Sequence, residues 1–343
     1  MTPRDRAERL REDARADPDA VNPDAVIEFL RHPSRPVQRV AAEALLPIVT
    51  EHPAAGTGVV ARIDHLLRTV ERGDREDDEF GETLLLCLAR IAGADPEKAL
   101  DAADAVLSLI DTDDPLAAPA SACLTQLVAA RPAAFVHDVD QFASLLEADD
   151  PAARRHAAHV LVEIGSEEPE AVRPAIPQLR ECLDDEDEEA AQKAAVVVGQ
   201  VARVDAVAVR PALPELVDAL AAETGGVRAN AVGALADLAA DLPGAVGEHQ
   251  RALATCLDDD AASVRRNAAA TLGRIADADV SLEESAHAGL VELLDDPDAT
   301  VRATACQALG QLSSPVAAEL LRTAADEDDE LAVRKAAERA LDD

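Results

Sequence analysis

The stretch Val264-Arg265-Arg266-Asn267-Ala268-Ala269-Ala270-Thr271-Leu272-Gly273-Arg274-Ile275 recurs through this chain. Written V-R-x-x-A-x-x-A-L-G-x-I, it returns every 37 residues, with its first residue at Leu116, Ala153, Ala190, Val227, Val264 and Val301. Looser copies begin at Val37, Phe80 and Val333. Apolar residues occupy offsets 0, 4, 7, 8 and 11 from the first residue, which is the stripe of an amphipathic helix. A fixed period of this size predicts a solenoid whose units bury their apolar faces against their neighbours.

The repeat also predicts how the whole chain is organised. We expect one all-α, right-handed solenoid of about nine antiparallel helix pairs across residues 1–343. Residues 1–20 should form an N-terminal capping helix, because Thr2 and Pro3 give a helix start. The most regular repeats should occupy residues 116–312, and residues 313–343 should form a truncated C-terminal repeat. The acidic insertion at residues 71–79 is expected to lengthen a turn.

A turn aspartate precedes an arginine of the motif helix in several repeats. The pairs Asp259 and Arg265, Asp296 and Arg302, and Asp328 and Arg334 are each six residues apart. This pattern resembles HEAT repeats from about residue 25 to residue 343. The resemblance implies a ladder of hydrogen bonds between the turn aspartates and these arginines of neighbouring units. The period is shorter than the usual ~40–47 residues and is similar to the HEAT-like units of bilin-lyase-type proteins. The arginine position is occupied by Gln38, Gly81, Ala117 and Ala191 in four repeats.

Acidic residues outnumber basic residues by 68 to 32, which gives a formal net charge of −36. The acids are concentrated in the turns between helices, as in Asp258-Asp259-Asp260. Such a surface resembles that of cytosolic proteins of salt-accumulating halophiles, because salt screens its self-repulsion. The sequence has no secretory or membrane-spanning apolar run, so we expect a cytoplasmic protein without membrane insertion. The five cysteines occupy repeat positions and are expected to be small buried thiols.

The HEAT resemblance implies that the second helix of each pair lines a concave face, with offsets 2, 3, 6 and 10 pointing outward. This face is neutral to basic although the chain is acidic. It therefore predicts a groove for an acidic or polar protein partner of unknown identity; the simpler alternative is that second helices tolerate any polar residue. The predicted partner-binding residues are Arg155, His156, His159, Lys193, Asn230, Arg266, Asn267, Arg274, Gln307 and Gln311.

We predict a non-enzymatic scaffold with no catalytic residue, metal or cofactor, and two alternatives remain open. In the first, a HEAT-like metalloenzyme of hydroxylase or lyase type, His156, His159 and Glu163 would supply ligands from one helix face. However, the His-Glu dipeptides of the HEAT-like deoxyhypusine hydroxylases are absent from this sequence. The second alternative is a HEAT protein that binds nucleic acid. This is disfavoured because the chain has no Trp or Tyr on which bases could stack.

Overall fold

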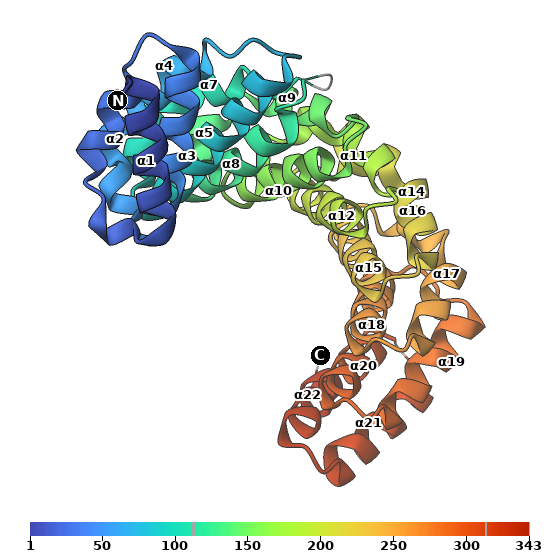
Figure 1. Cartoon of the computed structure of the whole chain (residues 1–343). Helices are drawn as coiled ribbons and strands as arrows, with labels where there is room; N and C mark the ends of the chain where they lie inside the picture. Colours follow the sequence, from blue (N-terminus) through green and yellow to red (C-terminus); the bar gives the residue numbers. More distant parts are fainter. Residues whose placement is uncertain (112–113, 313, 343) are drawn as a thin grey trace. The chain divides into compact units, whose positions relative to one another are not determined.

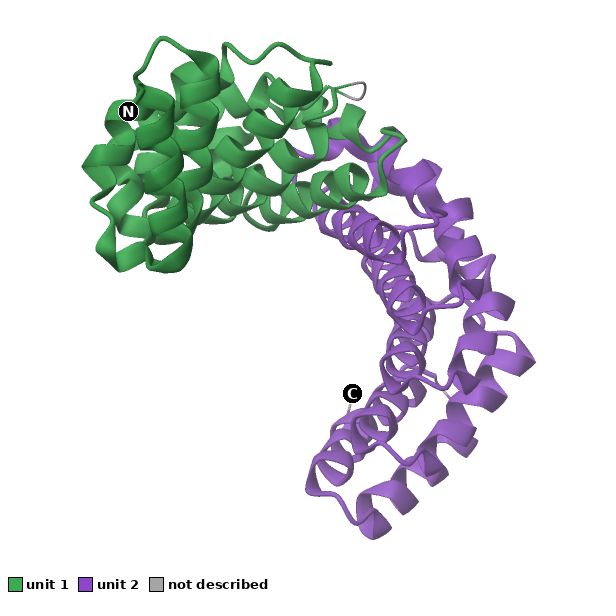
Figure 2. Cartoon of the chain, viewed as in Figure 1, with its two compact units in different colours: residues 1–168 green, residues 169–343 purple. Residues whose placement is uncertain are grey.

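The computed structural model describes residues 1–111, 114–312 and 314–342, and within these ranges all regular secondary structure is helical. Helices follow one another as antiparallel pairs along the chain (Figure 1). The prediction of an all-α solenoid is therefore confirmed. The chain divides into two compact units, Met1–Glu168 and Pro169–Asp343 (Figure 2). The description of residues 1–343 as a single solenoid stays a prediction.

In unit 1, a leading helix is followed by four pairs within the described residues. The leading helix is α1 (Pro3–Ala16), followed by the short turn η1 (Pro18–Ala20). The pairs are α2 (Pro23–Leu30) with α3 (Arg35–Glu51); η2 (Pro53–Val59) and α4 (Val60–Leu67) with α5 (Arg75–Ala94); α6 (Pro96–Ala99), η3 (Leu100–Ala102) and α7 (Ala103–Leu107) with α8 (Ala117–Ala130); and η4 (Pro132–Phe135) and α9 (Val139–Leu145) with α10 (Pro151–Glu167).

Unit 2 contributes five pairs in its described part. They are η5 (Arg173–Ala175) and α11 (Ile176–Cys182) with α12 (Glu188–Ala202); α13 (Ala206–Val209), η6 (Arg210–Ala212), α14 (Leu213–Asp218) and η7 (Ala219–Ala221) with α15 (Gly225–Ala239); α16 (Pro243–Gly247), α17 (Gln250–Thr255) and η8 (Cys256–Asp258) with α18 (Ala262–Asp277); α19 (Glu284–Glu292) and η9 (Leu293–Asp295) with α20 (Ala299–Gly310); and α21 (Pro315–Glu327) with α22 (Leu331–Asp342). The second helices line the inner side of the curve that this unit forms (Figure 1).

Helix α1 covers the side of α3 that no other pair occupies. Its start is fixed by a capping box, in which the Asp5 amide donates to Thr2 Oγ1 at 3.1 Å and the Thr2 amide donates to Asp5 Oδ2 at 2.7 Å. Its apolar stripe places Ala7 in one cluster with Val37 and Val40 of α3. The N-terminal residues therefore close the apolar face of the first pair.

Only the first part of the acidic insertion at residues 71–79 belongs to the turn between α4 and α5. Helix α5 already begins at Arg75 because the Asp74 side chain accepts hydrogen bonds from the amides of Glu76 and Asp77, at 3.0 and 3.1 Å. Acidic residues in the first turn are further stabilised by the helix dipole. The second half of the insertion is thus helical, and our expectation for it was wrong.

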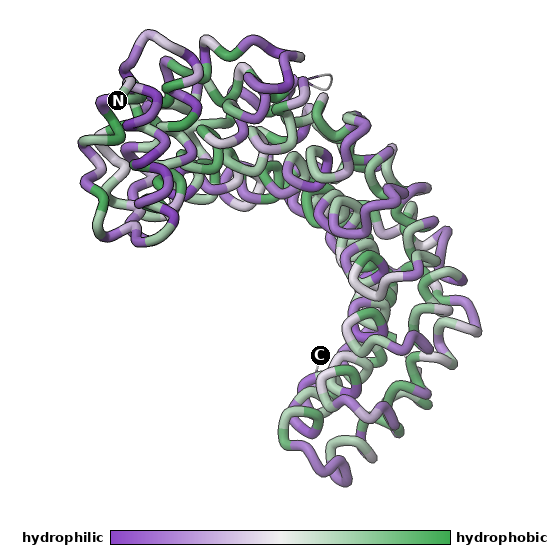
Figure 3. Tube along the Cα trace, viewed as in Figure 1, coloured by the Kyte–Doolittle hydropathy of each residue, from purple (hydrophilic) through white to green (hydrophobic). Residues whose placement is uncertain are grey.

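Second helices of unit 2 approach one another closely through small residues. A Cβ placed on Gly273 would lie 3.0 Å from Ala308 Cα, and one placed on Gly310 would lie 2.6 Å from Ala340 Cβ. Both glycines stand at offset 9 of the repeat, and both alanines at offset 7 of the next repeat. Hydrophobic and hydrophilic residues alternate along the tube (Figure 3), as expected of amphipathic helices. All five cysteines are buried, as predicted.

Candidate functional site

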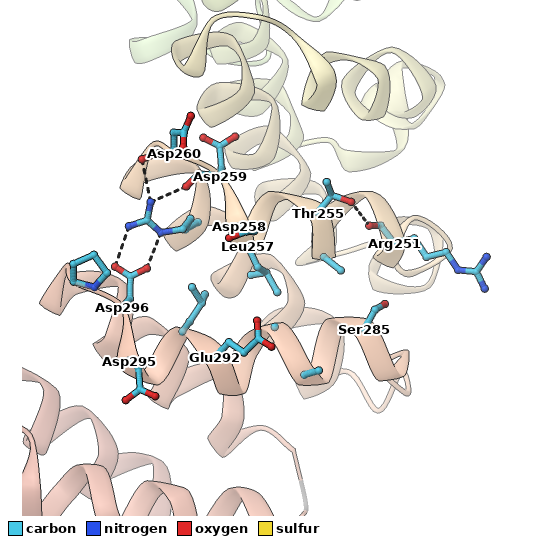
Figure 4. Close-up of a pocket in the computed structure, with 16 residues that line it drawn as sticks. Arg251, Thr255, Leu257, Asp258, Asp259, Asp260, Ser285, Glu292, Asp295 and Asp296 are labelled. Carbon is cyan, nitrogen blue, oxygen red and sulfur yellow. Dashed lines mark hydrogen bonds and ion pairs between the residues drawn. The ribbon is translucent and has the colours of Figure 1, made fainter.

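Arginines and aspartates join consecutive turns of unit 2. Arg265 donates through Nε and Nη2 to the two carboxylate oxygens of Asp296, at 2.6 and 2.9 Å. Its Nη1 donates to the carbonyls of Asp259 and Asp260 in its own turn, at 2.7 and 3.1 Å (Figure 4). Arg228 binds Asp259, and Arg302 binds Asp328, in the same two-pronged way. The ladder implied by the HEAT resemblance is therefore present in these repeats.

These ion pairs are largely shielded from water. The side chains of Arg265 and Asp296 are 12% and 3% exposed. The hydrogen bonds from Arg228 hold the pKa of Asp259 below its ordinary value. Burial is the largest influence on the pKa of Asp296 and raises it, but the hydrogen bonds from Arg265 and from the Asp298 amide, together with the charge of Arg265, leave that pKa lowered. The aspartates consequently stay ionised and act as structural anions.

A different set of ion pairs links the turns in unit 1, and sequence reasoning missed it. Arg35 Nε lies 3.4 Å from Asp77 Oδ1, and Arg72 Nε lies 3.1 Å from Asp114 Oδ2. Each of these arginines also donates to a backbone carbonyl of the next turn. The 37-residue spacing between the two arginines, and between the two aspartates, was the signal that could have revealed these pairs.

Several predicted partner-binding residues join neighbouring second helices of unit 2. The side-chain amide of Asn230 donates to the Gln192 carbonyl at 3.1 Å, and that of Asn267 donates to the Ala229 carbonyl at 2.9 Å. Arg274 donates to the Ala236 carbonyl and lies 3.8 Å from the carboxylate of Asp237. Lys193 pairs with Glu189 of its own helix at 3.1 Å. These four residues therefore already have intramolecular roles.

The structure brings four of the predicted residues to the exposed face of α18 and α20. Arg266, Arg274, Gln307 and Gln311 are all exposed. The last three line a cleft of about 280 Å³, with Gly273 and Ala308 between the two helices. Within the described ranges, Arg266 Nη2 makes one weak contact, at 3.5 Å to Asn267 Oδ1. Among the described residues, the side-chain amides of Gln307 and Gln311 form no hydrogen bond with another residue.

The three predicted residues of α10 lie in unit 1 and are half-buried. His156 Nδ1 lies 3.4 Å from Ser121 Oγ on α8, and His159 Nε2 lies 3.5 Å from Glu163 Oε1. Arg155 takes part in other contacts within the chain. The trio His156, His159 and Glu163 does not form a cluster with metal-binding geometry in the described structure.

A cleft of about 930 Å³ lies between the α17–η8 and α19–η9 segments of unit 2 (Figure 4). Its rim carries the exposed acids Asp258, Asp260, Glu292 and Asp295. Arg265 also lines it but is held by Asp296. This cleft therefore belongs to the ladder and adds no cation to the partner-binding face.

A family model for HEAT repeats matches residues 139–236 and 250–342, which together exceed half of the chain. The chain belongs to the HEAT-repeat family. This HEAT protein is also similar to the crystal structure of an engineered protein, with a TM-score of 0.78 and 23% identity over 99% of this chain and 94% of that one. At this identity the likeness concerns the fold alone. No curated protein matches the sequence at a significant level.

The architecture is thus that of a repeat scaffold, of the type that presents extended surfaces for binding. In the described part of the chain, every helix is too short or too polar to cross a membrane.

Proposed function

We propose that this HEAT protein is a non-enzymatic scaffold that binds a protein partner through the faces of its second helices. The observation that carries the proposal is the exposed group on α18 and α20. Arg266, Gln307 and Gln311 keep most of their hydrogen-bonding capacity, and the two glutamines line a cleft that can receive a partner side chain.

The chemistry of this surface favours an acidic or amide-bearing segment. A guanidinium group can bind both oxygens of a carboxylate, and the planar amides of glutamine can donate and accept at once. Arg274 contributes less charge than Arg266, because Asp237 lies beside it. Asn230 and Asn267 offer chiefly their Oδ1 atoms, since their amide nitrogens are engaged.

The remaining predicted residues extend the proposal along the second helices. Lys193 adds a cation on α12 of unit 2 that is shared with Glu189. Arg155, His156 and His159 give α10 of unit 1 its own polar face. We propose that each unit presents its surface separately to the partner.

The test compares two double variants in affinity purification from the native host at its native salt concentration. Arg266→Glu/Arg274→Glu reverses the charge of the proposed face, whereas Asp258→Asn/Asp295→Asn neutralises two exposed acids of the acidic cleft as a control. We expect the first variant to lose the specific partner at least tenfold and the control to keep it. Exposed substitutions usually change stability by less than ~0.5 kcal/mol; Arg274→Glu also removes the bond to the Ala236 carbonyl, so circular dichroism and thermal unfolding verify that both variants keep their helicity. Retained binding by the first variant and loss by the control would assign binding to the acidic surface.

A further inference from the structure

Arg334 of α22 has the same place in its repeat as Arg265 in α18, one position after the first residue of the motif. Its Nη1 donates to the carbonyls of Asp328 and Asp329 in its own turn, at 2.7 and 3.0 Å. Arg265 Nη1 makes the same two bonds to its own turn, at 2.7 and 3.1 Å. The guanidinium of Arg334 is therefore held by its turn in the same way as that of Arg265.

The two arginines differ at the other edge of the guanidinium, which carries Nε and Nη2. In Arg265 these atoms donate to Asp296 at 2.6 and 2.9 Å, and Arg228 and Arg302 bind their aspartates in the same way. Arg334 forms no ion pair with a carboxylate of the described chain. Its Nε and Nη2 can thus bind an external carboxylate, and a guanidinium that is already held in place loses little further freedom on binding one.

Helix α22 also differs from the other second helices of unit 2 at the positions that face a following helix, which are offsets 5 and 9. At offset 5, the Val232 carbonyl accepts a hydrogen bond at 3.5 Å from Thr271, which is at offset 7 of the next repeat. At offset 9, a Cβ on Gly273 would lie 3.0 Å from Ala308, again at offset 7 of the next repeat. A residue at offset 7 of a following helix therefore lies between offsets 5 and 9 of the helix before it.

In α22 these two offsets carry acids. Glu338 stands at offset 5 and Asp342 at offset 9, and both side chains are exposed. The other repeats of unit 2 have small or apolar residues there, which are Ala195, Val232, Ala269 and Cys306 at offset 5 and Gly199, Ala236, Gly273 and Gly310 at offset 9. A cation at offset 7 of a helix docked against α22 would therefore face both carboxylates.

Leu331 adds an exposed apolar side chain to the same face of α22. It stands three residues before Arg334 and is 54% exposed. The equivalent residue of α15 is Gly225, where a Cβ would lie 3.5 Å from Ala261 Cβ in the next turn. A turn docked against α22 would thus contact Leu331 through the residue that corresponds to Ala261, two positions after the ladder aspartate Asp259.

We propose that Leu331, Arg334, Glu338 and Asp342, which we call the α22 surface, bind a turn and the helix that follows it in a partner protein. The four residues are spaced by three or four positions and therefore lie on one face of the helix. The partner's turn would supply an aspartate to Nε and Nη2 of Arg334. Its helix would supply a lysine or arginine to Glu338 and Asp342, so that the charges of the two sides are complementary.

The spacing within the ladder predicts the sequence of the partner segment. Ala308 follows Asp296 by twelve residues, and Ala340 follows Asp328 by the same number. The partner should therefore have a lysine or arginine twelve residues after its turn aspartate, and an apolar residue two positions after that aspartate.

A second copy of this chain does not fit the α22 surface. The ladder aspartates Asp259, Asp296 and Asp328 are already bound by arginines of the chain. The residues twelve positions after them are uncharged, namely Thr271, Ala308 and Ala340. None of these could neutralise the two acids of α22, which would lose contact with water on docking. The occupant is therefore a different protein.

The probe is a helical peptide that copies residues 257–277 of this chain, with Ala261→Leu and Thr271→Lys introduced and a crosslink between the positions of Arg266 and Ala270 to hold the helix. It contains the ladder aspartate Asp259 with the predicted apolar and basic residues after it. Of two control peptides, one has Asp259→Asn and the other keeps Thr271. Binding to the full chain is measured by fluorescence anisotropy. We expect each control to bind about tenfold more weakly than the probe in dilute salt, with a smaller difference in concentrated salt.

Variants of the protein locate the binding. Arg334→Ala should weaken the probe about tenfold, and Arg334→Lys should weaken it less, because lysine keeps the charge but not the two parallel donors. Arg322→Ala removes an exposed arginine of α21 and should change binding less than about twofold. Glu338→Lys/Asp342→Lys should weaken the probe, and a peptide with Thr271→Glu in place of Thr271→Lys should regain the loss. Circular dichroism and thermal unfolding verify that each variant is folded.

Three results would overturn the proposal. The first is equal binding of the probe and the Asp259→Asn peptide, or probe binding that survives Arg334→Ala. The second is a dimer of the full chain in sedimentation that Arg334→Ala dissociates, because the occupant would then be a second copy. The third is loss of the probe in Arg266→Glu/Arg274→Glu, which would place its binding on the face of α18 and α20 instead.

Discussion

The two units link consecutive turns with the same pair of residue types taken from different positions. In unit 2 the arginine belongs to the second helix, and its Nε and Nη2 both donate to the next aspartate, as in Arg265 and Asp296. In the first pairs of unit 1 the arginine stands at or before the start of the second helix, as in Arg72, whose Nε lies 3.1 Å from Asp114 Oδ2. Both units thus have an ion pair between consecutive turns, although the arginine comes from a different sequence position in each.

Removing the arginine should cost unit 2 more than unit 1. Arg265→Ala would strand the buried carboxylate of Asp296, with an expected loss of about 3 kcal/mol. Arg72→Ala should cost less, about 2 kcal/mol, because it removes one contact with the carboxylate instead of two, although Asp114 is only 2% exposed and is also left buried. Hydrogen exchange measures the loss separately in α18–α20 and in α5–α8. Equal losses in the two units would contradict the comparison.

The second difference between the units concerns offset 9, where the repeats that begin at residues 190, 227, 264 and 301 of unit 2 have Gly199, Ala236, Gly273 and Gly310, and those of unit 1 have Leu46, Ala89, Thr125 and Val162. Gly310→Ala should destabilise the last pairs by about 1–3 kcal/mol, because the new methyl group meets Ala340. Gly93→Ala, in an open position of α5, is the matched control and should stabilise by up to ~1 kcal/mol. Thermal unfolding measures both. If Gly310→Ala were neutral, the close approach of α20 and α22 would not be essential.

Acid should weaken the two-pronged pairs of unit 2. The pKa of Asp259 is lowered in the folded chain by the bonds from Arg228, whereas an unfolded aspartate titrates near pH ~3.9. The stabilisation is therefore complete above about pH 4 and is lost as the pH falls through the lowered pKa. We expect the protection of α18 against hydrogen exchange to decrease over this range. Arg228→Leu/Asp259→Leu lacks the pair and should show a shallower decrease; an equally steep one would assign the acid sensitivity to other groups.

The fold was predictable because every repeat has the same pattern of apolar residues along its second helix. The apolar offsets that define Val264 to Ile275 recur in nearly every unit, and the residues at these offsets are buried. The six-residue spacing of Asp259 and Arg265 likewise reflects a real contact, between the Asp259 carbonyl and the Arg265 guanidinium.

The replacement of the ladder arginine by alanine in some repeats could not be explained from the sequence of one repeat alone. Ala191 replaces an arginine, and Ala222, the position 31 residues later, replaces its aspartate. Ala117 and Ala148 show the same joint loss. Both members of a pair are thus absent together, which leaves no buried charge without a partner. Only the observed pairing of Arg228 with Asp259, at the same 31-residue spacing, makes this relation visible.

The outward-facing polar offsets of the second helices could be read from the sequence, but the contacts that their side chains make within the chain could not be predicted. Offsets 2, 3, 6 and 10 all point away from the apolar stripe. The structure separates them, because Asn230 and Asn267 at offset 3 reach the backbone of the preceding helix, whereas Arg266 at offset 2 remains exposed. This division depends on how closely adjacent second helices pack, which no single helix pattern encodes.

The close contacts between glycine and alanine give unit 2 a mechanical asymmetry. Along the second helices, neighbouring repeats touch through the smallest side chains, such as Gly273 and Ala308. Along the turns, they are fastened by charged pairs such as Arg265 and Asp296. When the ends of unit 2 are pulled apart, we expect the contacts between glycine and alanine to separate first, while the ion pairs between the turns stay intact. The curvature of the unit would then decrease before any helix unfolds.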